Sequence, residues 1–139
     1  MSSSIAGGCG IAALVAGLLL ASGLAAAQGV AETATYRNAR ILAGALPNAD
    51  NLSLQDYRAF VLQQSYPGAS VDYAPMRENW FVLSGTRDGV MFYERVTFTC
   101  GGKLINSWAM LYPAAERRLY DRVVEQVSKS YRAGGGNCG

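Results

Sequence analysis

Hydrophobic and polar residues alternate along much of the second half of the chain, a pattern that predicts β-strands. Strand-like runs occur at Val71–Tyr73, Trp80–Leu83, Val90–Cys100 and Leu104–Tyr112. Asp88-Gly89 lies between the second and third runs and supplies the positive φ that a tight hairpin needs. We therefore expect the last three runs to form an antiparallel meander.

Two segments with helical spacing flank these strands. The first begins with Ser53-Leu54-Gln55-Asp56, which has the form of a capping box, and ends at Tyr66-Pro67-Gly68. The second opens at Pro113, a position that tolerates a missing amide. Its apolar residues gather on one side of a helical wheel, namely Leu119, Tyr120, Val123, Val124, Val127 and Tyr131. This order predicts an α+β fold, an antiparallel β-meander packed by a helix before it and a C-terminal helix, after an N-terminal signal helix.

The first thirty residues contain none of the 12 basic and 10 acidic residues of the chain. Within them, Ile11–Leu20 is an apolar run, and Ala25 and Ala27 fit the A-x-A pattern that signal peptidase recognises. We expect residues 1–27 to be a signal peptide and the mature protein to start at Gln28. The competing interpretation is an uncleaved membrane anchor over Ile5–Ala27, which is long enough to span a bilayer.

The domain organisation follows from this boundary. We expect residues 28–50 to be a weakly ordered arm with one short strand near Tyr36–Leu42, residues 51–132 to form the α+β domain, and residues 133–139 to be a flexible glycine-rich tail. The expected location is the periplasm or the medium after cleavage. A net charge of +2 is too near neutral to predict a nucleic-acid partner.

Two cysteines follow the expected cleavage site, Cys100 and Cys138. An exported protein meets oxidising conditions, so we favour a disulfide over two free thiols. Such a bridge would stabilise the fold by roughly 4 kcal/mol in the chain-entropy model, for a loop of about 39 residues.

No catalytic, cofactor-binding or metal-binding residue is predicted. The chain has no histidine, which removes histidine-assisted nucleophiles and the commonest metal ligand. Ser84 lies where a hairpin begins and lacks the surroundings of a nucleophile elbow. Glu94 and Arg95 are neighbours on a strand and should point to opposite sides of the sheet, and no second acid converges on Glu94.

Aromatic residues exceed what one thin core needs. Trp80, Phe92 and Trp108 could line a binding surface on the strands, and the structural alternative is a core beneath a second helix. The basic residues of the last helix could contact anionic lipid or an acidic partner, and the alternative is an ordinary solvated face.

Four stretches, Asn51–Phe60, Asn79–Gly85, Met91–Gly102 and Tyr112–Tyr120, resemble a family of small exported bacterial proteins of unassigned function. More distantly, the strand pattern and the C-terminal helix look like the PsbP/Mog1-type α+β sandwich. The resemblance implies a central antiparallel sheet flanked by helices and supplies no catalytic residues. In that family a strand pair precedes the first helix, whereas Ile41–Pro47 takes its place here. We therefore expect part of the sheet to be missing.

The functional hypothesis is an exported, non-enzymatic binding or accessory module of the bacterial envelope. Its expected partner is an envelope or secreted protein, with possible homo-oligomers through an exposed sheet edge. Contact with the membrane is expected only through the N-terminal segment before cleavage, and no cofactor is expected. The alternatives are a small enzyme that uses carboxylates or Tyr, and a membrane-tethered envelope protein.

Overall fold

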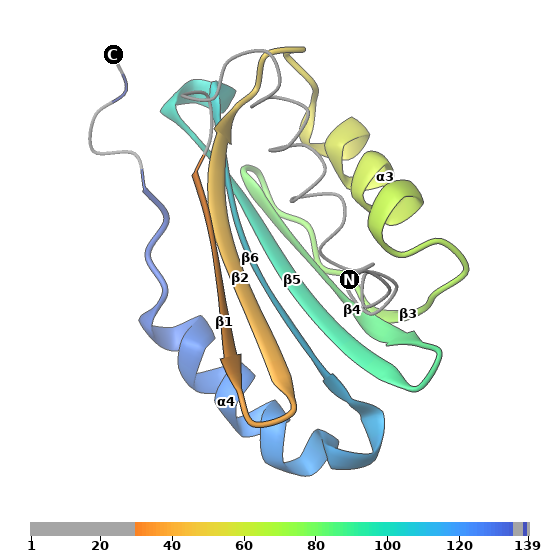
Figure 1. Ribbon diagram of the computed structural model, residues 1–139. Helices are drawn as coiled ribbons and strands as arrows, with labels where there is room; N and C mark the ends of the chain where they lie inside the picture. The colour runs from red at the N-terminus through yellow and green to blue at the C-terminus, as the bar shows by residue number, and fades with distance from the viewer. Residues whose placement is uncertain (1–29, 135–137, 139) are drawn as a thin grey trace.

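The computed structural model describes residues 30–134 and residue 138, and Figure 1 shows its elements. The expected signal peptide and the start at Gln28 lie outside the described residues. Six strands and two α-helices follow one another in the order β1 Val30–Tyr36, β2 Ala39–Pro47, α3 Leu54–Ser65, β3 Ser70–Tyr73, β4 Trp80–Arg87, β5 Val90–Thr99, β6 Leu104–Pro113 and α4 Arg117–Ser130. Two short 3-10 turns, Cys100–Gly102 and Ala114–Glu116, connect β5 to β6 and β6 to α4.

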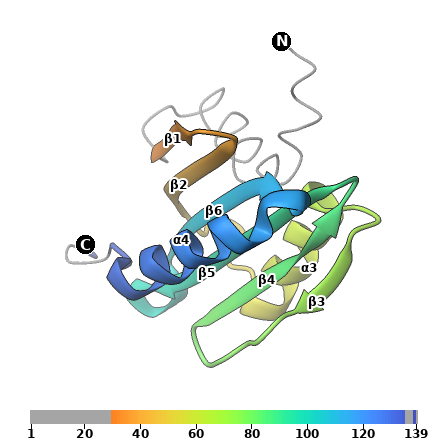
Figure 2. The same cartoon turned by 90° about the horizontal axis from the view of Figure 1, so that it is seen from below.

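The strands form one antiparallel sheet in the order β1-β2-β6-β5-β4-β3. The two helices cover opposite faces of this sheet (Figure 2), because alternate residues of the same strands join different core clusters. The predicted α+β class, the meander and both flanking helices are thus confirmed.

The segment expected to be a weakly ordered arm is instead a hairpin of two strands. Strand β1 pairs with β2 over seven positions, and β2 pairs with β6 over eight, from Arg40–Leu111 to Pro47–Leu104. The expectation of a weakly ordered arm is therefore wrong. The hairpin is rich in Ala, Gly and Thr, which give a weak local signal, and it is ordered by pairing with the distant β6.

Each face of the sheet has its own core. On the α3 side, buried side chains of the strands pack with Leu54, Tyr57 and Val61 of α3. On the α4 side, Trp108, Met110 and Tyr112 of β6 pack with Tyr120 and Val124 of α4. The sheet is the middle layer of three.

The two helices begin differently. Ser53 caps α3 as predicted, because its Oγ accepts a hydrogen bond from the Asp56 amide at 3.0 Å. Helix α4 starts at Arg117 and not at Pro113, since Pro113 is extended and pairs with Val90 at the end of β6. Leu119, predicted for the apolar side of this helix, is 47% exposed.

The disulfide between Cys100 and Cys138 is present, with a Cα–Cα distance of 5.3 Å. It ties the residues after α4 to the turn between β5 and β6. Gly134 lies against this end of the sheet, since a Cβ atom there would be 3.3 Å from Asn106 Oδ1. Residues 131–134 therefore run along the α4 side of the sheet.

Candidate functional site

The three aromatic residues predicted to line one surface do not lie together. Phe92 is 1% exposed in the α3-side core, where its ring stacks on Tyr66 with centroids 3.9 Å apart. Trp108 is 1% exposed in the α4-side core. Trp80 is half-buried and, being paired with Thr97, belongs to the α4 side. Two of the three are core residues, so the shared surface predicted from the sequence does not exist.

Trp80 nevertheless lies beside two arginines on the α4 side. The guanidinium of Arg95 lies over its ring, 4.2 Å from the centroid, and that of Arg77 lies 5.9 Å from it. A guanidinium over an indole is attracted by the ring and is held in one place. Arg95 is thus positioned by an aromatic residue.

A groove of about 250 Å3 opens beside Arg95. It is lined by Arg95 and Thr97 of β5 and by residues at the end of α4 and beyond it, namely Ser128, Tyr131, Arg132 and Ala133. We call it the arginine groove. It contains two guanidinium groups and no carboxylate.

No acidic side chain neutralises either arginine. The ion pairs of the described residues are Arg87–Asp88, Arg117–Asp121 and Lys129–Glu125, none of which involves the arginine groove. Arg132 donates to the backbone carbonyls of Lys129 and Tyr131, which holds its Nη1 at the end of α4. Burial raises the pKa of Tyr131, and the Arg95 guanidinium partly offsets the rise, which places that positive charge near the Tyr131 hydroxyl.

Thr97 adds an unsatisfied hydroxyl to the groove. The residue is 8% exposed, and its Oγ1 is buried without a hydrogen-bond partner among the described residues. Such a group loses hydration without compensation, so it is rare in folded proteins. Trp108 Nε1 is in the same condition, and its ring packs on Tyr131, with centroids 6.0 Å apart.

A second unusual group lies on the opposite side of the same strand. Glu94 is 1% exposed and accepts a hydrogen bond of 2.6 Å at Oε1 from the Tyr66 hydroxyl. Burial raises the pKa of Glu94 to about 7, although the hydrogen bond from Tyr66 favours the ionised form. Burial and then the Glu94 charge raise the pKa of Tyr57 and of Tyr66. The predicted opposite orientation of Glu94 and Arg95 is confirmed.

Glu94 is a core group, because it is enclosed between the sheet and α3 and has almost no exposed surface. Perturbed pKa values often mark functional sites, but a general acid must also reach a substrate. The geometry around Glu94 offers no such access. We therefore place the candidate site on the other face of β5.

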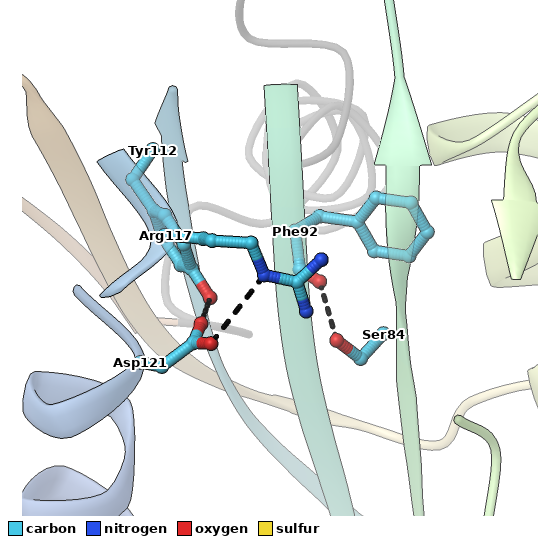
Figure 3. A network of polar contacts seen from close by, with 5 residues as sticks. All are labelled: Ser84, Phe92, Tyr112, Arg117 and Asp121. Carbon is cyan, nitrogen blue, oxygen red and sulfur yellow. Dashed lines mark hydrogen bonds and ion pairs between the residues drawn. The ribbon is translucent and has the colours of Figure 1, made fainter. Parts of the chain in front are cut away.

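Two further polar contacts have structural roles (Figure 3). The Tyr112 hydroxyl donates to Asp121 Oδ1 at 2.7 Å, and Arg117 Nε lies 3.6 Å from Asp121 Oδ2, which fixes the first turns of α4 to β6. Burial and this hydrogen bond raise the pKa of Tyr112. The Ser84 hydroxyl donates to the Phe92 carbonyl oxygen at 2.9 Å, between the paired strands β4 and β5.

The two edges of the sheet differ in how far they are protected. Strand β3 has four residues, a register shift between Val71 and Tyr73, and Pro75 shortly after it. It also passes so close to β4 that a Cβ atom at Gly85 would lie 2.0 Å from the Ser70 carbonyl oxygen. Strand β1 has seven residues in continuous register, without proline and with Glu32 as its one charged residue, and residues 31–36 are exposed. Strand β1 is thus the unprotected edge.

Two other kinds of site are absent from the described part of the chain. Residues 30–134 and 138 contain no group of three potential metal ligands drawn from His, Cys, Asp and Glu. None of their helices has the length and apolar character needed to cross a bilayer.

Comparison with known proteins identifies the fold alone. No family model and no curated protein matches the sequence. The structure is similar to the crystal structure of PA94, a protein of unknown function from Pseudomonas aeruginosa, with a TM-score of 0.56 and 11% identity. That similarity covers 77% of this chain and 84% of PA94.

The sequence pattern did not predict the arginine groove. Arg95 is a polar residue in an alternating strand, and nothing local indicates that the residues after α4 pack beside it. The sequence does contain a signal for the burial of Glu94, because strand alternation places it on the same face as Phe92, Val96 and Phe98. A charged residue in that register signals a buried carboxyl group.

Proposed function

We propose that this protein is an exported, non-enzymatic binding module that pairs its edge strand β1 with an extended segment of another envelope or secreted protein. The observation that carries the proposal is the contrast between the two sheet edges. Natural proteins shorten, bend or charge the edges that must stay free, as β3 illustrates. Strand β1 is neither short nor bent and carries a single charge at Glu32, and within the described residues the backbone donors and acceptors of its outer side are unpaired.

The chemistry of β1 supports an extended peptide as the occupant. Seven residues offer an edge of about 23 Å, which is the length of a typical strand. In strand addition, backbone hydrogen bonds provide much of the affinity and alternate side chains provide the selectivity. One side of β1 presents Ala31, Thr33 and Thr35, and the other presents Glu32, Ala34 and Tyr36.

Export of the module rests on the uncharged N-terminal segment and its A-x-A ending. The three-layer arrangement of the described residues also supports the proposed relationship to PsbP/Mog1-type sandwiches, because helices cover both faces of a central antiparallel sheet. A carboxylate enzyme is the less favoured function, since the one buried acid is enclosed in the core.

Site-specific crosslinking tests the proposal. A photo-crosslinking residue is placed at Thr35 on β1 and, as the matched control, at Ser70 on the opposite edge; both positions are exposed. We expect the Thr35 probe, and not the Ser70 probe, to capture one dominant protein from the envelope fraction. A synthetic peptide of the captured segment should then bind, and Thr33→Lys should weaken its binding about tenfold by placing an unpaired charge on the edge strand.

The alternative outcomes are distinct. Capture of a second copy of this chain, together with a dimer in solution, would make β1 a self-association edge and overturn the proposal. Equal capture at Thr35 and Ser70 would also contradict it. Mass spectrometry of the probe-carrying protein gives its own N-terminus: Gln28 supports export with cleavage, whereas an intact Met1 supports the membrane-tethered alternative.

A further inference from the structure

The arginine groove lies on the α4 side of the sheet, apart from the edge strand in the proposed function. We propose that it binds the oxyanion group of a small ligand, a phosphate or a carboxylate, between the guanidiniums of Arg95 and Arg132 and above the hydroxyl of Thr97. Three independent observations carry this assignment: the charge of the groove, the positioning of its arginines and the unsatisfied hydroxyl of Thr97, a residue that lines it.

The charge of the groove favours an anion. Arg95 and Arg132 converge on it from β5 and from the residues after α4, and no carboxylate lines it. All ten acidic residues of the chain lie in its described part, and none forms an ion pair with either arginine. Guanidinium groups bind phosphate and carboxylate through paired N–H donors, and such charge-assisted bonds are stronger than neutral ones.

Both arginines are already held in position before any ligand binds. Trp80 holds the Arg95 guanidinium from one side at 4.2 Å. Backbone carbonyls at the end of α4 accept from Arg132 Nη1 at 3.0 and 2.8 Å. Since less side-chain entropy is lost on binding, positioned arginines favour association over freely rotating surface arginines.

The Thr97 hydroxyl distinguishes a binding site from a basic surface. Its Oγ1 is buried and has no partner within the described residues, while the residue lines the groove. A ligand oxygen placed between the two arginines could accept the missing hydrogen bond. Arg132 is exposed, so a ligand can enter the groove from solvent.

The test is a titration of the disulfide-bonded protein with inorganic phosphate and, separately, with sodium acetate at constant ionic strength. Amide chemical shifts report the location, and Trp80 next to Arg95 gives a fluorescence signal. We expect saturable shifts at residues 95–97 and 128–133. The probe that saturates at the lower concentration identifies phosphate or carboxylate as the preferred oxyanion.

Three variants separate specific binding from charge screening. Arg95→Gln should weaken binding at least about tenfold through the loss of charge-assisted bonds, and Thr97→Val about threefold through the loss of one donor. Thr97→Val should not lower stability, because the hydroxyl it removes is unpaired. Arg122→Gln, on the exposed surface of α4, lowers the net charge equally and should leave binding unchanged within about twofold.

Linear shifts that never saturate, or equal losses in Arg95→Gln and Arg122→Gln, would overturn the assignment. So would unaltered affinity in a folded Thr97→Val variant. These results are independent of strand addition at β1, which the Thr35 crosslink tests separately.

Discussion

The two faces of the sheet use adjacent residues of one strand in opposite ways. On the α3 face, Glu94 is enclosed with Tyr66, and burial raises its pKa to about 7. On the α4 face, the Arg95 guanidinium lies beside a groove and over the Trp80 ring. The strand alternation that separates them by one residue thus places one ionisable group in the core and the other within reach of solvent.

This comparison shows why burial alone does not mark a site. The α3 face is closed by the aromatic and aliphatic residues of a complete core, and its carboxyl group is satisfied by a hydrogen bond. Each face also contains a buried hydroxyl without a partner among the described residues, Ser107 on the α3 face and Thr97 on the α4 face. Only Thr97 lines a groove, so the α4 face is the better place to look for a ligand.

The largest expected effect comes from removing the central ring of either face. Trp108→Ala and Phe92→Ala should each lower the free energy of unfolding by about 3–5 kcal/mol, since both side chains are 1% exposed. Urea denaturation followed by circular dichroism measures the change. The milder Trp108→Phe keeps most of the packing and should remain folded. It therefore allows the stability contribution of the α4 face to be measured if the alanine variants do not fold. A loss below about 1 kcal/mol for either variant would show that its ring contributes little to the packing of that core.

Loss of the disulfide should have the second-largest effect on stability. It should act mainly on the α4 side of the sheet, because the bridge attaches the residues after α4. Replacing both cysteines with serine should lower the free energy of unfolding by about 2–4 kcal/mol, mainly by freeing the unfolded chain. Thermal melts of the oxidised and variant proteins measure the loss. Hydrogen exchange should rise more at residues 131–134 than in α3, since only the former lose a local attachment as well as global stability. Equal melting temperatures would mean that the bridge contributes nothing to stability.

The pH dependence of stability should come from the α3 face. The folded-state pKa of Glu94 lies above the usual value of 4.5, so the folded protein retains a proton that the unfolded chain releases. Stability should therefore fall as pH rises from about 4.5 to 7, by up to roughly 3 kcal/mol, and then level off.

Glu94→Gln isolates this effect. The amide keeps a hydrogen-bond acceptor for Tyr66 and cannot ionise, so the variant should match the natural protein near pH 5 and exceed it at pH 8. Denaturation midpoints at both pH values give the answer. A Glu94→Gln protein that retains the same fall in stability would place the titrating group elsewhere, and Asp88→Asn, at an exposed turn, serves as the control.

Local signals predicted those elements whose causes are local. The Ser53 cap, the Asp88-Gly89 turn and the alternation from Trp80 to Tyr112 each act within a few residues. The α+β class and the meander followed from them. The Cys100–Cys138 bridge could be predicted because only two cysteines follow the expected cleavage site.

Long-range pairing explains what could not be predicted. The β1–β2 hairpin carries small residues, and its order depends on contact with β6. The sequence shows that Phe92 and Trp108 are aromatic but not that strand pairing sends them to opposite faces. The arginine groove requires the residues after α4 to return beside β5, which no local pattern records.

The pairing of β2 with β6 also has a consequence for how the protein folds. Strands β3 to β6 can pair with one another in sequence order, because short connections join them. Strand β2, in contrast, pairs with β6, which is distant from it in the sequence. Closing so long a loop is slow compared with forming a hairpin, so the meander should assemble first and the hairpin should dock onto it last. Until β2 pairs with it, the outer edge of β6 has unpaired backbone donors and acceptors that can pair with another chain. Misassembly and aggregation therefore compete with the native fold at this final step.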